Sequence, residues 1–161
     1  MPIIYYYPKN EQIDSFLSNG ISLSQNFDKE VSINGYIKRC IVCLLNPKDD
    51  IEKFEKEEKV CLKLDIDYSS CYVADGFFIE DGALGPKTIE LEKYELGTFK
   101  TPVALLTTSV FAEQISTLNK DIDVPVLYDN SRDLFYSKKN ARILDEISPK
   151  ELFYLLNKWK N

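Results

Sequence analysis

The chain has 161 residues, of which 44% are hydrophobic and 29% charged, and its formal net charge is −6. These values are typical of a globular domain with a core of its own and argue against disorder. The acidic balance disfavours a broad, sequence-independent grip on nucleic acid. The sequence contains no histidine, which excludes every mechanism that needs an imidazole, including Ser-His-Asp hydrolysis and histidine phosphotransfer.

The sequence predicts a cytoplasmic protein that folds as a single domain over residues 1–161. No segment approaches the ~20 apolar residues that cross a bilayer, so we expect no membrane partner. Residues 1–10 lack the basic and apolar regions of a secretory signal. The cysteines Cys40, Cys43, Cys61 and Cys71 are therefore expected as reduced thiols. Cys40 and Cys43 lie three residues apart in an expected strand, which places them on opposite faces, so we expect no bound metal.

Patterns in the first part of the chain predict strands that alternate with helices. Ile3 to Tyr7 is a β-branched and aromatic run that Pro8 ends, and Val60 to Ile66 alternates between apolar and polar positions. The other expected elements are a helix from Asn10, its N-cap, to Gly20, its left-handed C-cap; a polar loop at 25–35; a central apolar strand at 36–45; and a charged helix from Asp49 and Asp50 to Lys59, with Ile51 and Phe54 facing inward.

Patterns in the second part predict mostly strands, so we expect an α+β fold with a mainly antiparallel sheet. The expected elements are a strand from Cys71 to Ala74 before a turn at Asp75 and Gly76; a loop around Gly82, Gly85 and Pro86; a strand from Pro102 to Leu106; a helix capped by Ser109 with Phe111, Ile115 and Leu118 inward; a hairpin of strands at 124–128 and 134–136; and a last helix that begins at Ser148 and Pro149.

Several of these segments, in order, resemble one known family. The strand and helix from Ile4 to Ser24 are similar to the opening of ADP-ribosyltransferase-like domains. Three further segments are similar to the DarT-type group, whose members are DNA-modifying toxins: residues 42–48, residues 72–76, and residues 105–115. The resemblance spans roughly residues 3 to 118. It implies a mainly antiparallel split sheet with short flanking helices, and NAD as the substrate. From the strand, helix and glycine at the start of the chain we expect a cleft beside Ile3–Tyr7, with Tyr5 or Tyr6 facing it.

The resemblance also implies site residues and two departures from the family. The family's histidine falls on Tyr6, and its catalytic glutamate falls near Val103, which carries no charge. We therefore take Tyr6, Glu90, Glu92 and Glu95 as catalytic candidates. The candidates for contact with NAD are Tyr5, Tyr6, Ser22, Ser24 and Arg39, and the candidates for contact with the acceptor are Lys48 and Asp75.

Each candidate also has a structural interpretation. Tyr5, Tyr6 and Tyr7 suit a strand whose aromatic rings pack on both faces, Arg39 and Lys48 suit the solvated ends of a strand, and Asp75 suits a tight turn. The functional alternatives are an active ADP-ribosyltransferase that modifies nucleic acid or protein, a catalytically inactive binding or regulatory module of a toxin–antitoxin or phage-defence system, and an unrelated interaction domain.

Overall fold

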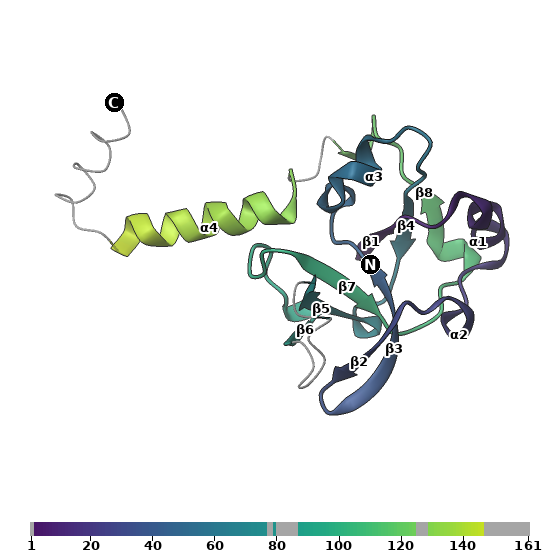
Figure 1. Ribbon diagram of the computed structural model, residues 1–161, viewed down its shortest axis with the longest axis horizontal. Coiled ribbons are helices and arrows are strands. Elements are labelled where there is room, and N and C mark those ends of the chain that lie inside the picture. The colour runs from purple at the N-terminus through teal and green to yellow at the C-terminus, as the bar shows by residue number, and fades with distance from the viewer. Residues whose placement is uncertain (1, 77–78, 80–86, 125–128, 147–161) are drawn as a thin grey trace.

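The computed structural model describes residues 2–76, 79, 87–124 and 129–146. Its strands form two antiparallel sheets with helices beside them, so the fold is α+β, as the sequence predicted (Figure 1). The strands are β1 (Ile3–Tyr6), β2 (Lys29–Ile33), β3 (Tyr36–Cys43), β4 (Leu62–Asp65), β5 (Cys71–Asp75), β6 (Thr88–Glu90), β7 (Pro102–Leu106) and β8 (Ile115–Thr117). The α-helices are α1 (Ile13–Asn19), α2 (Leu23–Asn26), α3 (Ile51–Glu55) and α4 (Ser131–Glu146); the 3-10 helices are η1 (Asn10–Gln12), η2 (Pro47–Asp49), η3 (Tyr68–Ser70), η5 (Leu91–Lys93) and η6 (Ala112–Gln114).

The two sheets meet at the end of β1. One sheet has the strand order β1-β4-β8 and the other has the order β2-β3-β7-β5-β6. Tyr5 forms an isolated antiparallel bridge to Leu44, just beyond β3. The two residues exchange hydrogen bonds, with each N–H 2.8 Å from the other's carbonyl oxygen. The strand predicted at 36–45 is central, because β3 has β2 on one side and β7 on the other.

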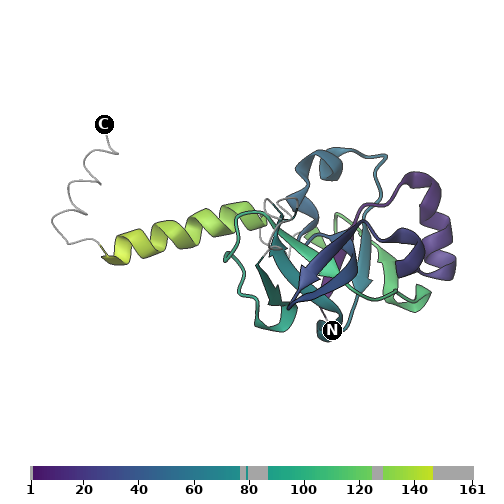
Figure 2. The ribbon, with the colours of Figure 1, turned by 60° about the horizontal axis from the view of Figure 1, so that its bottom comes forward.

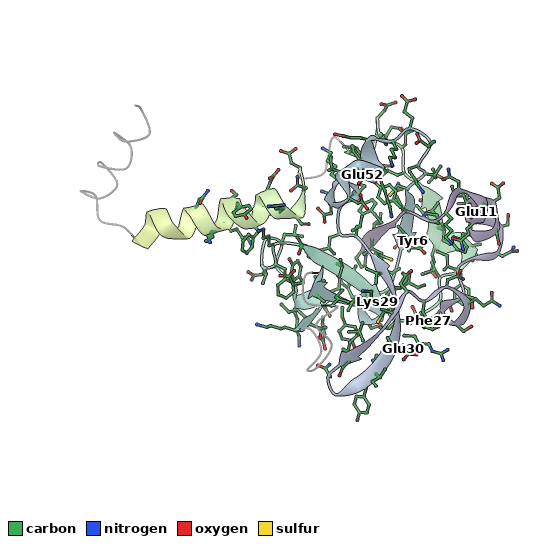
Figure 3. All side chains as sticks on the ribbon, in the orientation of Figure 1. Tyr6, Glu11, Phe27, Lys29, Glu30 and Glu52 are labelled. Carbon is green, nitrogen blue, oxygen red and sulfur yellow. The ribbon has the colours of Figure 1, made fainter. Side chains whose placement is uncertain are left out.

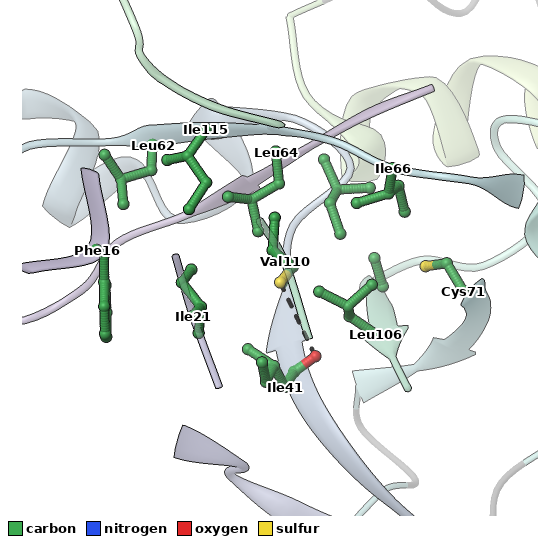
Figure 4. Packing of buried hydrophobic residues seen from close by; sticks show 13 residues of the cluster. Phe16, Ile21, Ile41, Leu62, Leu64, Ile66, Cys71, Leu106, Val110 and Ile115 are labelled. Carbon is green, nitrogen blue, oxygen red and sulfur yellow. Dashed lines mark hydrogen bonds between the residues drawn. The ribbon is translucent and has the colours of Figure 1, made fainter. Parts of the chain in front are cut away.

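The largest core cluster fills the space between the two sheets (Figure 4). Leu62 and Leu64 of β4 are fully buried, as the alternating pattern predicted. Cys61 is also buried, on the opposite face of the chain, so this segment is covered on both sides. The cluster is completed by residues from both sheets and from the α1 region: Ile4, Phe16, Ile21, Ile41, Cys43, Ile66, Cys71, Ala104, Leu106, Val110 and Ile115.

The first helix ends where the sequence predicted but begins differently. Residues 10–12 form η1, and the side chain of Asn10 is not an N-cap, because that position belongs to Lys9. At the other end, the N–H of Gly20 donates to the carbonyl oxygen of Phe16. Gly20 has φ 81° and ψ −175°, a combination open essentially only to glycine and more extended than the expected left-handed cap. This backbone brings Ile21 into a bridge with Val110.

The segment predicted as a polar loop, residues 25–35, is mostly ordered secondary structure. It contains the end of α2 and the whole of β2, which pairs with β3 as a hairpin. Asn34 and Gly35 form the turn, both with positive φ. Asn-Gly is a strong signal for a two-residue hairpin turn, so this strand was open to prediction from the sequence.

Two further predicted helices are shorter or absent. The helix expected at 49–59 is η2 followed by the short α3; Asp50 does cap it by accepting the N–H of Lys53, but Ile51 is 51% exposed. The helix expected after Ser109 is η6 followed by strand β8, and Phe111 is 72% exposed instead of inward. The helical spacing of Phe111, Ile115 and Leu118 therefore gave a wrong prediction here, because Ile115 pairs with Leu64 of β4 in a strand.

The hairpin predicted around residues 129–133 is wrong where the structure describes it. The sequence pattern assigned Leu134, Phe135 and Tyr136 to a strand, but these three residues belong to α4. The helix begins where Asn130 accepts the N–H of Asp133, a capping interaction that a short aromatic run does not reveal. Figures 1 and 2 show α4 extending away from the sheets. Residues 125–128, the loop glycines Gly82 and Gly85, and the helix expected at Ser148 lie outside the described residues.

The start of α4 is fixed to the body by Asp49. The N–H of Ser131 donates to Asp49 Oδ1 at 2.7 Å and its hydroxyl donates to Asp49 Oδ2 at 2.6 Å. We expect Asp49→Ala to lower the free energy of unfolding by about 1 kcal/mol, as the loss of a helix cap does. Trypsin should then cleave faster within α4, at Arg132, Lys138 and Lys139. The exposed Asp121→Ala is the control, and equal cleavage rates for the two variants would contradict this anchoring role.

Within the described residues, no helix has both the length and the apolar character needed to cross a membrane.

Candidate functional site

A cleft of about 540 Å³ lies beside the end of β1, and we call it the tyrosine cleft. Tyr5, Tyr6 and Tyr7 all line it, so the expected cleft beside the first strand is present. Figure 3 labels Tyr6 together with Phe27, which comes from the segment before β2. The other lining residues come from the chain between β1 and α1, from the end of α2 and the segment before β2, from β3 and its end, and from the α3 region: Pro8, Lys9, Gln12, Gln25, Asn26, Phe27, Asp28, Val42, Leu44, Asp50 and Lys53.

The alternation of β1 gives its tyrosines different surroundings. Tyr6 packs against the main core, with its ring centroid 6.5 Å from that of Phe16, whereas Tyr5 is buried beside Cys61 and Leu118. The hydroxyl of Tyr7 donates to the carbonyl oxygen of Pro47 at 2.7 Å. Burial, and next the nearby Asp28, raise the pKa of Tyr6 to about 12. The Tyr6 phenol is therefore protonated at neutral pH and can act as a hydrogen-bond donor.

Asp28 is the carboxylate whose charge raises the pKa of Tyr6, and it was not among the candidates taken from the sequence. Its N–H donates to the carbonyl oxygen of Cys40, and its Oδ2 accepts the N–H of Val42 at 2.8 Å. Desolvation raises the pKa of Asp28, and the hydrogen bond from Val42 partly opposes that shift. The Asn34–Gly35 turn is the signal that predicts this pairing of Asp28 with β3, because the hairpin register follows from the turn.

The other charges of the tyrosine cleft are mostly paired within the protein. Lys53 Nζ lies 3.7 Å from Asp50 Oδ2. Arg39, a candidate for contact with NAD, stacks 4.9 Å from the centroid of the Phe27 ring and pairs with Glu30 at 3.6 Å. It thus supports a residue of the cleft wall and is not itself part of the lining.

A second hollow, of about 390 Å³, contains other candidates, and we call it the strand-end pocket. Lys48 lines it with Gly76 and Val103, the position of the family's glutamate. Lys48 Nζ lies 3.9 Å from Asp129. The neighbouring Asp75 accepts the hydroxyl of Thr101 at 2.7 Å. Both hollows share Leu44 as a lining residue, so they are adjacent near the junction between the sheets.

Val103 and Tyr6 face different clusters. Val103 packs with Leu105 in the core cluster that contains Cys40, whereas the alternate residues Ala104 and Leu106 belong to the cluster against which Tyr6 packs. The structure therefore does not bring the residue at the glutamate position into the tyrosine cleft.

The acidic candidates of residues 90–95 lie elsewhere. Glu90 and Glu92 line a third hollow, of about 410 Å³, beside Tyr72, and Glu90 pairs with Lys93 at 3.3 Å. Glu95 is exposed. Strand β6 is at the edge of its sheet, separated from β3 by β5 and β7, so these carboxylates do not meet Tyr6.

The serine candidates lie at the start of α2. The hydroxyls of Ser22 and Ser24 are 3.1 Å apart, and neither residue lines the tyrosine cleft. The carbonyl oxygen of Ser22 accepts the side-chain amide of Asn26, which does line it, at 2.9 Å. Their geometry indicates an indirect role, in which the α2 turn holds Asn26 in the wall.

The cysteines are arranged as the strand pattern predicted. Cys40 and Cys43 are both buried, but they pack into two different core clusters on opposite faces of β3. In the described part of the chain, no group of three or more acidic or cysteine side chains is placed to hold a metal ion.

Comparison of the chain with protein-family models, with curated proteins and with solved structures gives no match.

Proposed function

We propose that the chain is an ADP-ribosyltransferase-like domain that binds NAD, with the nicotinamide end of NAD in the tyrosine cleft. The observation that carries this proposal is the cleft itself, which lies at the end of β1 where the resemblance to the family begins. Its volume of about 540 Å³ falls within the range of small-molecule sites.

The lining of the tyrosine cleft has the chemistry that this ligand needs. Aromatic rings of Tyr6 and Phe27 offer flat apolar surface, and the Tyr6 phenol and the amide of Asn26 offer hydrogen bonds to a carboxamide or a ribose hydroxyl. The lining combines four aromatic side chains with amide and charged side chains that can orient a polar ligand.

Transfer of ADP-ribose is expected to be slow. When the glycosidic bond breaks, its electron pair goes to the nicotinamide ring and positive charge develops on the ribose. A preorganised group aimed at developing charge is typically worth ~3–4 kcal/mol, or roughly two to three orders of magnitude in rate. Val103 provides no such charge and lies outside the tyrosine cleft. This observation favours, as the second candidate function, an inactive NAD-binding or regulatory module. An active form would modify a nucleic acid or a protein.

Titration calorimetry with NAD tests the binding proposal. We expect binding that weakens about tenfold in Tyr6→Ala, because an aromatic contact of ~1.4 kcal/mol is lost. Tyr36→Ala, at the 72% exposed tip of the hairpin, is the matched control and should bind as the unmodified chain does. No heat of binding, or equal weakening in both variants, would refute the proposal.

Nicotinamide release separates the two candidate functions. Slow release that accelerates with a nucleic-acid or protein acceptor supports the transferase, whereas NAD binding with no release supports the inactive module. If release occurs, comparison of Glu90→Gln, Glu92→Gln and Glu95→Gln shows whether any of these carboxylates contributes.

A further inference from the structure

The tyrosine cleft combines aromatic side chains with one carboxylate that no ion pair within the described residues neutralises. Asp28 lines the cleft and is exposed to solvent, so a ligand can reach it. Asp28 and Tyr6 both line this cleft, so one ligand can face the carboxylate and the aromatic ring together. We propose that the tyrosine cleft selects a flat aromatic cation of the N-alkylpyridinium class, and that Asp28 recognises the positive charge of its ring.

The orientation of Asp28 is set before any ligand arrives. Strand β2 begins at Lys29, which pairs with Cys40, so the N–H of Val42 lies beyond the last strand pair of that hairpin. Asp28 Oδ2 accepts this N–H at 2.8 Å. The hydrogen bond holds the carboxylate at the cleft wall at no further entropic cost on binding, which is the advantage of a preorganised site.

Burial raises the pKa of Asp28, whereas the nearby charges of Lys53 and Lys29 lower it, so these lysines favour the charged form of the carboxylate. Lys53 is engaged with Asp50 at 3.7 Å, and Arg39 is engaged with Glu30 and with the ring of Phe27. Lys9 is exposed at the cleft margin. A cationic ring placed against Tyr6 would gain both the attraction of the aromatic face and the attraction of the carboxylate.

This inference deepens the proposed function, because the oxidised nicotinamide end of NAD is an N-alkylpyridinium cation. The inference can also be tested without NAD, because it concerns only the pyridinium ring and not the rest of the NAD molecule. The useful probes are 1-methylnicotinamide, which is the cation, and nicotinamide, its neutral analogue of almost the same shape.

The experiment measures the affinities of both probes by NMR titration at neutral pH. We expect the unmodified chain to bind 1-methylnicotinamide about fivefold more tightly than nicotinamide, a difference of ~1 kcal/mol that is typical of a solvent-open charge contact. Asp28→Asn should abolish this preference. The asparagine oxygen can still accept the N–H of Val42, so the hairpin contact is retained. Asp14→Asn, the same change at an exposed position of α1, should keep the preference.

Equal affinity for the two probes in the unmodified chain would overturn the inference, as would a preference that persists in Asp28→Asn or a failure of both probes to bind. The NAD proposal fails separately: a cation preference that depends on Asp28, in a chain that does not bind NAD, supports this inference and refutes NAD as the ligand.

Discussion

Gly20→Ala is expected to lower the free energy of unfolding by about 3–5 kcal/mol. Gly20 has φ 81° with an extended ψ, a conformation that costs a residue with a side chain ~1–3 kcal/mol. A Cβ atom there would also lie 2.4 Å from the carbonyl oxygen of Val110, which is main chain and is held by its bridge to Ile21. The strain and the clash act together, so the substitution should be among the most damaging in the chain. Urea unfolding followed by circular dichroism measures it.

Gly35→Ala is the matched control for this change. Gly35 also has positive φ, 85°, but a Cβ atom there meets nothing within 4 Å. We expect a loss of only about 1 kcal/mol, the cost of the backbone conformation alone. If the two alanine variants unfolded at the same urea concentration, the close approach of Gly20 to Val110 would have no energetic weight.

Leu106→Ala is expected to cost about 3 kcal/mol. Leu106 is fully buried, and its strand, β7, lies between β3 and β5, so its side chain fills the core between the sheets. Removal of a buried leucine side chain loses its transfer free energy and leaves a cavity, with costs of 2–5 kcal/mol in comparable cores.

Leu96→Ala makes the same chemical change at a position that is 43% exposed, and we expect it to cost less than about 0.5 kcal/mol. The urea dependence of unfolding should have the same slope in both leucine variants, since the unfolded chains expose similar areas. A loss for Leu106→Ala as small as that of Leu96→Ala would contradict the packing described for this cluster.

Sequence reasoning located the strands whose pattern is local. The apolar runs of β1, β3 and β7 and the alternation around β4 each have one dominant interpretation, and the structure confirms them. Where it failed, the deciding contacts are distant in the chain. Residues 115–117 became a strand because β4, more than 50 positions earlier, offered an open edge, and α4 begins beside Asp49, 82 positions from Ser131.

The position of the tyrosine cleft could be predicted from the sequence, but the carboxylate that lines it could not. The three tyrosines and the glycine after α1 indicated a cleft beside the first strand. Asp28 was not a candidate, because a single aspartate in a polar segment carries no pattern. Its importance arises only when the hairpin of β2 and β3 brings it to Val42 and into the lining of the tyrosine cleft. Conversely, Glu90 and Glu92 were close to the expected position in sequence but are separated from Tyr6 by the width of a sheet.

The union of the two sheets at Tyr5 and Leu44 uses only main-chain atoms. Any residue other than proline can supply those N–H and carbonyl groups. A change in the exposed parts of the cleft tyrosines therefore leaves this bridge between the sheets in place. The ligand preference of the cleft can change while the junction of the two sheets is retained. Asp28 differs, because its side chain serves both the hairpin and the cleft. To redirect this pocket to a neutral or anionic compound, the conservative starting point is asparagine at that position, because Tyr6 also packs against the core.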